Sequence, residues 1–317
     1  MESAVFRGPG RIGIERVAVP VPGPGQVCVR LEGCGVCASN LPVWEGRPWF
    51  QYPFAPGAPG HEGWGRIAAV GPQVQDLREG ERVALLSCNA YAQYDLASQE
   101  AVVRLPAGLD GLAFPGEPLG CAMNAFRRSD IHAGQTVAVV GVGFMGALLI
   151  LLARQAGALV IALSRRPYAL AVARHCGAAE IIGTADRWAA VEQVKALTGG
   201  DGCDRVIEAA GEQATLDLAT ELTCEGGRLI IAGYHQDGPR QVNMQLWNWR
   251  GLDVINAHER DPAVAARGLR EAVAAVAGGR LDPFPLLTHS YRLDELPTAF
   301  AALRQRPDGF LKAVVAL

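Results

Sequence analysis

A glycine-rich segment between two apolar runs constrains this chain more than any other feature. Residues 137–140 are mostly β-branched, which is typical of a strand buried on both faces of a parallel sheet. The segment 141–146 reads GVGFMG and leads into an apolar helical stretch at 147–155, and a second apolar run follows at 159–163. This order of strand, glycine turn, helix and strand predicts a βαβ unit.

The three glycines of this GxGxxG segment have separate tasks in a dinucleotide site. Gly141 permits the tight turn, Gly143 lets the backbone approach a pyrophosphate, and Gly146 lets the helix pack close to the strand. Phe144 and Met145 lie where backbone N–H groups and the positive end of the helix dipole face the phosphates. A GxGxxG alone also serves ordinary turns, but its βαβ setting favours a dinucleotide site with these five residues as cofactor contacts.

The end of the second strand indicates which dinucleotide is bound. Enzymes that use NAD usually carry Asp or Glu there to hold the ribose 2′-hydroxyl. This chain has Ser164, Arg165 and Arg166 instead, and a hydroxyl beside two guanidiniums can hydrogen-bond a 2′-phosphate with charge assistance. We therefore favour NADP(H) over NAD(H), with two solvated loop arginines as the alternative interpretation.

Strands alternate with helical stretches through residues 124–256. Beyond the glycine segment, helices are expected at 168–176, 188–197 and 214–222, and strands at 180–182, 205–208 and 227–231. This alternation predicts an α/β doubly wound parallel sheet that binds its ligand at the carboxyl ends of the strands. Ala209 and Gly233 follow two of those ends and are further expected cofactor contacts.

The regions on either side of this domain have a different texture. Residues 1–123 are rich in Gly and Pro, as in a small all-β domain. Their short alternating apolar runs lie at 27–31, 65–70 and 82–86. Residues 257–317 contain an alanine-rich helical stretch at 263–277 and a final short helix and strand. Because this last part is too short for another domain, we expect it to pack back on the first one.

Composition narrows the class of protein. The chain has 317 residues with a net charge of −3, and 50% of them are hydrophobic, as in ordinary soluble α/β proteins. The slightly acidic balance offers no polyanion-binding surface, so nucleic acid is not expected as a partner. With no signal-like N-terminus and no apolar stretch of about 18 residues, we expect a cytoplasmic protein without a membrane partner. Eight scattered cysteines then favour thiols over disulfides.

Four residues of the first domain form a candidate metal site. Cys37, His61, Glu62 and Glu117 supply one sulfur, one nitrogen and two carboxylate oxygens. This mixture suits Zn²⁺ at a catalytic site, where one position stays open to water or substrate. Taken singly, a cysteine is commonly a small core residue and a glutamate a surface charge. The hypothesis therefore depends on their order ahead of a dinucleotide fold.

Five segments spread over the chain resemble one family. They are GCGVCASN at 33–40, PGHEGWGRIAAVG at 59–71, EPLGCAMNAF at 117–126, VAVVGVGFMG at 137–146 and VIEAAG at 206–211. Together they resemble the zinc-containing alcohol and polyol dehydrogenase branch of the medium-chain dehydrogenase/reductase family, and the EPL element is most similar to sorbitol and threonine dehydrogenases. The resemblance implies a GroES-like catalytic domain from residues 1–123 and 257–317, a Rossmann nucleotide domain at 124–256, and a homodimer or homotetramer.

The resemblance also implies roles for the candidate residues. Cys37 and His61 correspond to fixed zinc ligands, whereas Glu62 and Glu117 bind zinc directly or through its water and exchange roles during turnover. Ser39 corresponds to the residue that hydrogen-bonds the substrate oxygen and starts proton transfer. The implied reaction is hydride transfer between NADP(H) and an alcohol or ketone, with zinc as Lewis acid. A polyol, cyclitol or amino-sugar is the first expectation for the substrate.

The chain departs from that family at three places. Many relatives carry four closely spaced cysteines for a structural zinc, but Cys88 stands alone in the corresponding region, so one zinc per chain is expected. Asn40 replaces the usual Asp, and we expect its amide oxygen to accept the N–H of His61 without the charge that raises ligand basicity. Pro42 stands where relatives have a relay histidine, so a proton leaving Ser39 passes to ribose hydroxyls or water.

Two other functions stay open. One is a zinc-independent, NADPH-dependent reductase of enones or quinones on the same fold, against which the ligand set argues. The other is a non-catalytic sensor that binds NADPH without hydride transfer. Near Cys37, Cys34 is either a packing thiol or a redox partner. Four aromatic residues that follow either line the substrate pocket or pack the loop, namely Trp44, Trp49, Phe50 and Tyr52.

Overall fold

The computed structural model describes all residues, 1–317, and the chain divides into two compact units. The first unit contains Met1–Cys121 and Arg260–Leu317, and the second contains Ala122–Glu259. The expected boundaries at 123/124 and 256/257 lie close to these. The chain leaves the first unit within helix α2 (Gly116–Ser129) and returns to it after Glu259.

The first unit is built mainly from strands. They are β1 (Glu2–Gly8), β2 (Arg11–Arg16), β3 (Gln26–Val36), β4 (Gly63–Val70), β5 (Arg82–Leu85), β6 (Tyr94–Ser98), β7 (Val102–Arg104), β14 (His289–Arg292) and β15 (Ala313–Ala316). Its helices, besides the start of α2, are α1 (Leu41–Glu45), α8 (Pro262–Ala277) and α9 (Leu296–Gln305). Short 3-10 helices cover Ala38–Asn40, Gln99–Ala101, Ala107–Leu109, Phe284–Leu286 and Leu293–Glu295.

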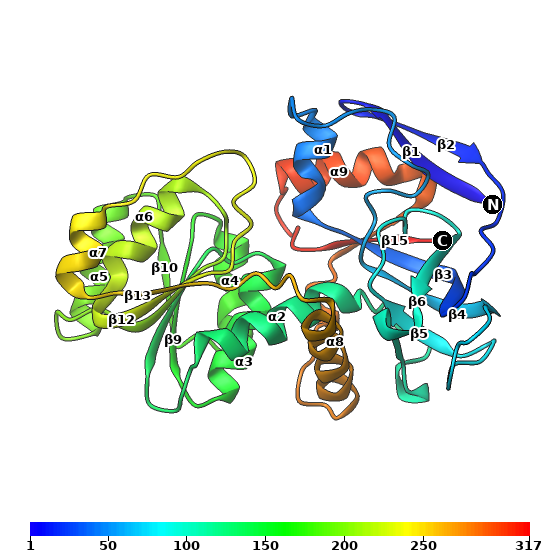
Figure 1. The fold of residues 1–317 in the computed structure, drawn as a ribbon. Helices are drawn as coiled ribbons and strands as arrows, with labels where there is room; N and C mark the ends of the chain where they lie inside the picture. The colour runs from blue at the N-terminus through cyan, green and yellow to red at the C-terminus, as the bar shows by residue number, and fades with distance from the viewer. The chain divides into compact units, whose positions relative to one another are not determined.

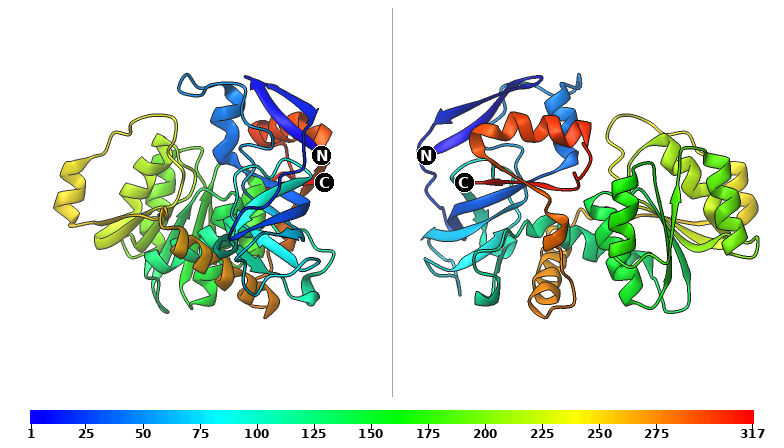
Figure 2. Two further views of the ribbon diagram at one scale, coloured as in Figure 1. Left: turned by 45° about the vertical axis from the view of Figure 1, so that its right-hand side comes forward. Right: turned by 180° about the vertical axis from the view of Figure 1, so that it is seen from behind.

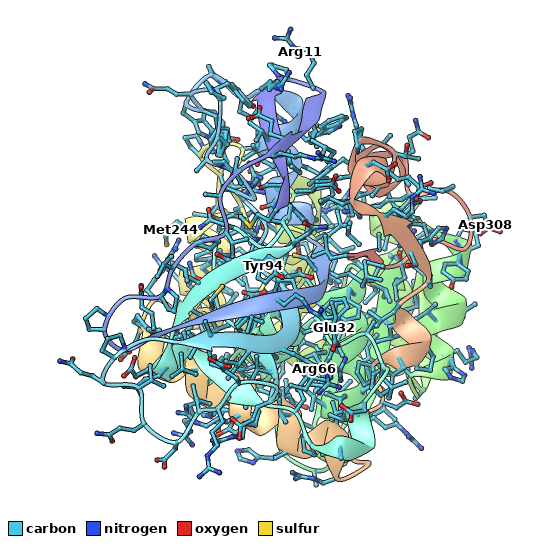
Figure 3. All side chains as sticks on the ribbon, turned by 90° about the vertical axis from the view of Figure 1, so that its right-hand side faces the viewer. Arg11, Glu32, Arg66, Tyr94, Met244 and Asp308 are labelled. Atoms are coloured by element: carbon cyan, nitrogen blue, oxygen red, sulfur yellow. The ribbon has the colours of Figure 1, made fainter.

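The strands of the first unit form a seven-stranded sheet and a separate hairpin. The sheet has the order β14-β15-β3-β4-β5-β7, with β6 also paired to β3. In the hairpin, β1 pairs with β2 (Figure 1). Across β3 and β4, Arg66 forms an ion pair with Glu32 at 3.2 Å (Figure 3). The core beneath includes Phe6, Tyr91 and Phe300, which are fully buried, and Phe6 meets Phe300 edge to face at 5.5 Å.

The C-terminal segment returns to the first unit, as the sequence analysis expected. β15 pairs antiparallel with β3, so that Ala313 lies opposite Val36 and Val315 opposite Cys34. α9 buries Phe300 in the core of the unit and stacks it on Trp44 at 5.6 Å. The pairing of β15 with β3 makes the last strand of the chain a direct neighbour of the strand that leads to Cys37.

The second unit alternates strands and helices. In chain order these are β8 (Thr136–Val140), α3 (Phe144–Gln155), β9 (Leu159–Ser164), α4 (Pro167–His175), β10 (Glu180–Gly183), α5 (Arg187–Leu197), β11 (Cys203–Glu208), α6 (Gln213–Leu222), β12 (Thr223–Ile231), α7 (Met244–Arg250) and β13 (Asp253–Asn256). The six strands are all parallel in the order β10-β9-β8-β11-β12-β13, with helices on both faces of the sheet (Figure 1, Figure 2).

The prediction of a doubly wound parallel sheet is confirmed, and its expected elements shift only at their ends. α3 starts at Phe144 rather than at 147, so Phe144, Met145 and Gly146 form its first turn. α7 and β13 were not predicted, because β13 is only four residues long and α7 buries none of its residues completely. None of the helices combines the length and apolar character needed to cross a membrane.

Candidate active site

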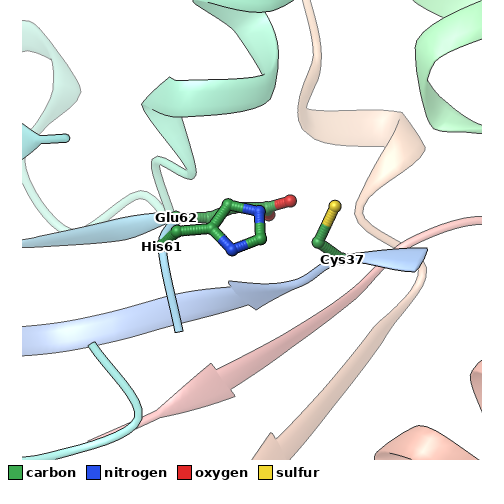
Figure 4. Close-up of side chains that lie close together, drawn as sticks. All are labelled: Cys37, His61 and Glu62. Atoms are coloured by element: carbon green, nitrogen blue, oxygen red, sulfur yellow. The ribbon is translucent and has the colours of Figure 1, made fainter. Parts of the chain in front are cut away.

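Three of the predicted ligands come together where two strands of the first unit meet. Cys37 directly follows β3, and His61 and Glu62 directly precede its antiparallel neighbour β4. Antiparallel pairing places the end of one strand beside the start of the next, which brings these distant residues together. The sulfur of Cys37, a ring nitrogen of His61 and a carboxylate oxygen of Glu62 all lie within 4.8 Å of one another (Figure 4).

The ring of His61 is oriented by the backbone. Its Nδ1 lies 2.9 Å from the carbonyl oxygen of Pro59, which can only accept, so Nδ1 carries a proton and Nε2 is the nitrogen that holds the lone pair in the neutral ring. Ser39 lies on the Nε2 side, with its Oγ 3.5 Å from that nitrogen, and donates a hydrogen bond to Cys37 Sγ at 3.1 Å. The structure therefore gathers Cys37, Ser39 and His61 around one point.

The prediction that Asn40 accepts the N–H of His61 is wrong. The Pro59 carbonyl takes that role, because it already points at Nδ1 from two residues before the histidine. Asn40 is buried and donates from Nδ2 to the same carbonyl at 3.1 Å and to the hydroxyl of Tyr91 at 3.2 Å. Asn40 therefore supports the acceptor of His61 rather than the histidine itself.

Glu62 has a partner that sequence reasoning missed. Lys312, which directly precedes β15, places its Nζ 2.7 Å from Oε1 and 2.6 Å from Oε2 of Glu62. The same ammonium donates to the carbonyl oxygen of Val36 at 3.1 Å, and both charged side chains are buried. The approach requires Gly35, since a Cβ there would lie 1.7 Å from Oε2. The sequence feature that indicates a buried ion pair here is Lys312 itself, a lysine inside the otherwise apolar run 310–317.

Glu117, the fourth predicted ligand, lies in the first turn of α2 and outside the close group of three. Cys121, one helical turn further on, donates its thiol to Glu117 Oε1 at 3.1 Å. Burial raises the pKa of Glu117, the nearby Glu62 raises it further, and His61 opposes the shift. The i, i+4 spacing of Glu117 and Cys121 was the sequence signal for this second contact.

The charges around His61 favour a cation. Burial opposes the imidazolium form, but the Cys37 sulfur and the carboxylates of Glu117 and Glu62 raise the pKa of His61 well above its ordinary value. Only Oε1 of Glu62 meets Lys312 with hydrogen-bond geometry, so the buried Oε2 has no hydrogen-bond donor. Sulfur, imidazole nitrogen and carboxylate oxygen in one small space are zinc donors, and the residues present fit that ion.

Most of the residues near Cys37 for which the sequence left two interpretations pack in the core of the first unit. Cys34 is fully buried, donates to the Gly35 carbonyl at 3.3 Å, and has its pKa raised well above the ordinary value by burial. This environment favours a packing thiol over a redox partner. Of the four aromatic residues that follow Cys37, Trp44, Phe50 and Tyr52 pack against the hydrophobic core of the first unit. Trp49 is 54% exposed.

The glycine-rich segment of the second unit has the geometry of a dinucleotide loop. Gly141 has φ +98°, which a residue with a side chain rarely adopts, and a Cβ on Gly146 would lie 2.1 Å from the Gly141 carbonyl oxygen. A Cβ on Gly143, by contrast, would meet no atom within 4 Å. The packing of this chain therefore leaves open space at Gly143, where a pyrophosphate would approach, and the residues fit a dinucleotide.

The other expected cofactor residues gather at the same edge of the sheet. Ala209 donates its N–H to the carbonyl of Val140, and Gly233 donates to the carbonyl of Glu208, both at 2.8 Å. Ser164, the last residue of β9, accepts a hydrogen bond from the backbone N–H of Arg166 at 3.3 Å. These residues therefore end or follow β8, β9, β11 and β12 at the carboxyl edge, as predicted.

The loop that follows Ser164 carries two differently placed arginines. Arg165 forms an ion pair with Glu212 at 3.2 Å, and Arg166 donates from its guanidinium to the Val142 carbonyl at 3.5 Å. The ion pair was not foreseen, because the two residues are 47 positions apart.

Comparison with known proteins agrees with this geometry. Residues 23–127 match the alcohol dehydrogenase GroES-like domain, and residues 145–272 match the zinc-binding dehydrogenase family. An alcohol dehydrogenase of Rhizobium meliloti (strain 1021) is 34% identical over an alignment 234 positions long, gaps included, which covers 63% of this chain and 68% of that protein. The chain belongs to the zinc-dependent medium-chain alcohol dehydrogenase family. It is an oxidoreductase of that family, and its GroES-like and Rossmann units are those of its relatives.

Other relatives extend over nearly the whole chain. The sorbitol dehydrogenase of Bacillus subtilis (strain 168) is 26% identical and covers 99% of this chain and 97% of its own length. A structure from Sinorhizobium meliloti 1021, described as a zinc-binding dehydrogenase bound to NADP, has a TM-score of 0.86 and 26% identity, and covers 100% of this chain and 99% of that one. The alcohol dehydrogenase of Thermus sp. ATN1 shares the fold with a TM-score of 0.84 at 24% identity, covering 100% of this chain and 99% of its own.

Proposed function

We propose that this enzyme transfers a hydride between NADP(H) and a secondary alcohol or its ketone, at a site where one zinc ion is bound by Cys37, His61 and the carboxylates of Glu62 and Glu117. The observation that carries the proposal is the group of three donors within 4.8 Å, with the Ser39 hydroxyl directly beside it. The sulfur of Cys37 and Nε2 of His61 lie on the same side as the Glu62 carboxylate, which supports a bound cation.

The side chains divide the work around the substrate oxygen. Zinc held here would supply a Lewis acid for that oxygen, and the nicotinamide would exchange the hydride. Ser39 can hydrogen-bond the same oxygen, because its hydroxyl is held beside Cys37 Sγ and His61 Nε2. Pro42 offers no proton acceptor, so the proton held by Ser39 passes to a ribose hydroxyl or to water.

The two glutamates have different freedom. Glu62 is held by the buried Lys312, which offsets its charge and leaves Oε2 without a hydrogen-bond donor. Glu117 is held only by the thiol of Cys121 and is half-buried at the start of α2. We therefore assign the fixed carboxylate position to Glu62 and the exchanging one to Glu117.

Cofactor and substrate preferences rest on other residues and on the relatives. The Ser164-Arg165-Arg166 loop supports NADP(H), as does the NADP-bound relative from Sinorhizobium meliloti. The sorbitol dehydrogenase of Bacillus subtilis supports a polyol, cyclitol or amino-sugar as the substrate class. Between β5 and β6 the chain carries Cys88 alone, which supports one zinc per chain. We further propose that the enzyme is a homodimer or homotetramer that works in the cytoplasm.

Metal content per chain, measured on purified protein and on a Cys37→Ser variant, tests this proposal first. We expect about one zinc in the wild type and almost none in the variant, because a serine hydroxyl is a poor replacement for thiolate. Cys88→Ser is the matched control and should keep its zinc. Two zinc ions per chain would refute the single site.

The reaction is then tested by incubating the enzyme with polyols, cyclitols and amino-sugars in the presence of NADP⁺ or NAD⁺. The absorbance of the reduced nicotinamide reports turnover. Substrate-dependent reduction of NADP⁺ that disappears in the Cys37→Ser variant supports alcohol oxidation. Zinc-free protein that reduces enones or quinones with NADPH would establish the reductase alternative instead. Protein that binds NADPH but turns over neither class would favour the sensor.

A further inference from the structure

An ion pair lies beside the cofactor loop in the second unit. Arg165, the first residue after β9, places its guanidinium 3.2 and 3.5 Å from the two carboxylate oxygens of Glu212, the residue before α6. The pair is open to solvent, with 70% of the arginine side chain and 51% of the glutamate side chain exposed. A ligand arriving from solvent can therefore reach both side chains.

The segment that carries Glu212 borders the glycine-rich loop. A Cβ on Gly141 would lie 2.9 Å from Cβ of Ala210 and 3.0 Å from its backbone nitrogen, so residues 209–210 pack directly on the loop. From the other side, the guanidinium of Arg166 reaches the Val142 carbonyl at 3.5 Å. The ion pair of Arg165 and Glu212 thus lies on the carboxyl edge of the sheet that the dinucleotide is expected to occupy.

A buried carboxylate fixes the position of Glu212. Glu208 is fully buried and accepts hydrogen bonds from the N–H groups of Ala210 and Gly211 at 2.8 Å and from the hydroxyl of Thr215 at 2.7 Å. Thr215 in turn accepts the N–H of Glu212, the residue before α6, at 3.3 Å. Glu212 is therefore held in place by its own segment as well as by Arg165.

We propose that Glu212 is a specificity-determining residue of the cofactor site. Its carboxylate holds Arg165 and repels a 2′-phosphate, and Glu212 thereby reduces the preference for NADP(H) over NAD(H). This inference rests on the proposed dinucleotide site. A phosphate monoester carries nearly two negative charges at neutral pH and binds arginine through charge-assisted hydrogen bonds. To bind it, Arg165 exchanges the carboxylate for the phosphate, while the negative charge of Glu212 stays nearby. NADH has no such group and makes no such exchange.

Dissociation constants for NADPH and NADH, measured by nicotinamide fluorescence on the zinc-containing protein, test the role of Glu212. Glu212→Gln keeps the size and shape of the side chain and removes only its charge. We expect it to tighten NADPH by about two- to fivefold, the scale of one exposed charge interaction, and to leave NADH unchanged. The gain should shrink between about 20 mM and about 500 mM salt, because exposed charges are screened.

Two further variants isolate the pair. Glu192→Gln removes another exposed carboxylate of the same unit, one that pairs with Lys195 at 3.7 Å, and should change neither affinity. Arg165→Gln should weaken NADPH selectively, and the effect of Glu212→Gln should largely vanish in the double variant. An equal response of NADPH and NADH to Glu212→Gln, or a response no larger than that of Glu192→Gln, would overturn the inference.

The same titrations keep this inference apart from the proposed function. A wild type that binds NADH more tightly than NADPH would contradict the proposed cofactor preference, yet a selective gain of NADPH affinity in Glu212→Gln would still support the role of Glu212. A wild type that prefers NADPH, with no gain in the variant, would leave the proposed function standing and remove Glu212 from specificity.

Discussion

The buried ion pair of Lys312 and Glu62 gives the strongest prediction about stability. Lys312 is 5% exposed and Glu62 is 0% exposed, and Nζ lies 2.7 Å from Oε1 and 2.6 Å from Oε2. Burial opposes the charge on Lys312, but the carboxylates of Glu62 and Glu117 and the sulfur of Cys37 raise its pKa above the ordinary value. The lysine is therefore charged at neutral pH, and each member of the pair needs the other.

Lys312→Met removes the ammonium while keeping an unbranched side chain of similar length. The Glu62 carboxylate would then be buried without its counter-ion, and the Val36 carbonyl would lose a donor. Breaking a buried pair from one side costs about 3–5 kcal/mol. The double variant Lys312→Met/Glu62→Gln buries no unpaired charge, and we expect it to recover most of that loss, to within about 1 kcal/mol of the wild type.

Hydrogen exchange on metal-free, reduced protein is the appropriate measurement, because two units need not unfold together. Peptides from β3 and β15 should lose protection in the single variant and regain it in the double variant, while peptides from β8 and β11 serve as the unaffected reference. Arg7→Met, which removes an exposed pair with Glu15, should leave all of them unchanged. A single variant that loses less than about 1 kcal/mol, or a double variant no better than the single, would refute the reasoning.

Three further predictions concern the second unit and the thiols. Burial opposes the charge of Glu208, but hydrogen bonds from His235 and neighbouring groups lower its pKa below the ordinary value of 4.5. The ionised Glu208 therefore stabilises the folded state above that pH, and this stabilisation is lost as the pH falls through the pKa of the folded state. Urea unfolding should therefore show Glu208→Gln less stable than the wild type at neutral pH, with a difference that narrows below about pH 4.5. Gly146→Ala would press a Cβ against the first glycine's carbonyl oxygen at 2.1 Å, and calorimetric titration should find NADPH binding at least about tenfold weaker. Burial raises the pKa of Cys203 to about 12, so mass spectrometry after iodoacetamide treatment at about pH 8 should find the exposed Cys88 alkylated and Cys203 unmodified in folded protein.

Local sequence patterns were enough for the second unit. Each expected strand and helix there depends on residues adjacent in the chain, and the GxGxxG turn is set by the backbone needs of three glycines. The same patterns missed α7 and β13. β13 is a short edge strand with partly exposed residues, and its pairing with β12 rather than its composition makes it a strand.

The metal donors were also visible in the sequence, but their partners were not. The types and order of Cys37, His61 and Glu62 pointed to zinc, because sulfur, nitrogen and carboxylate oxygen are zinc ligands wherever the chain brings them together. The sequence likewise showed that Asn40 could supply a hydrogen bond to the site. Which group Asn40 bonds depended on the Pro59 carbonyl, whose direction is set by the backbone of the loop.

The sequence by itself determined the βαβ alternation, the glycine turn and the chemical identity of the candidate ligands, since each follows from neighbouring residues or from side-chain chemistry. Only the tertiary structure decided that Lys312 would neutralise Glu62 and that Glu212 would hold Arg165. These contacts join residues 250 and 47 positions apart. Their existence depends on β15 pairing with β3 and on parallel strands ending at one edge of a sheet, and no local pattern in the chain encodes such long-range register.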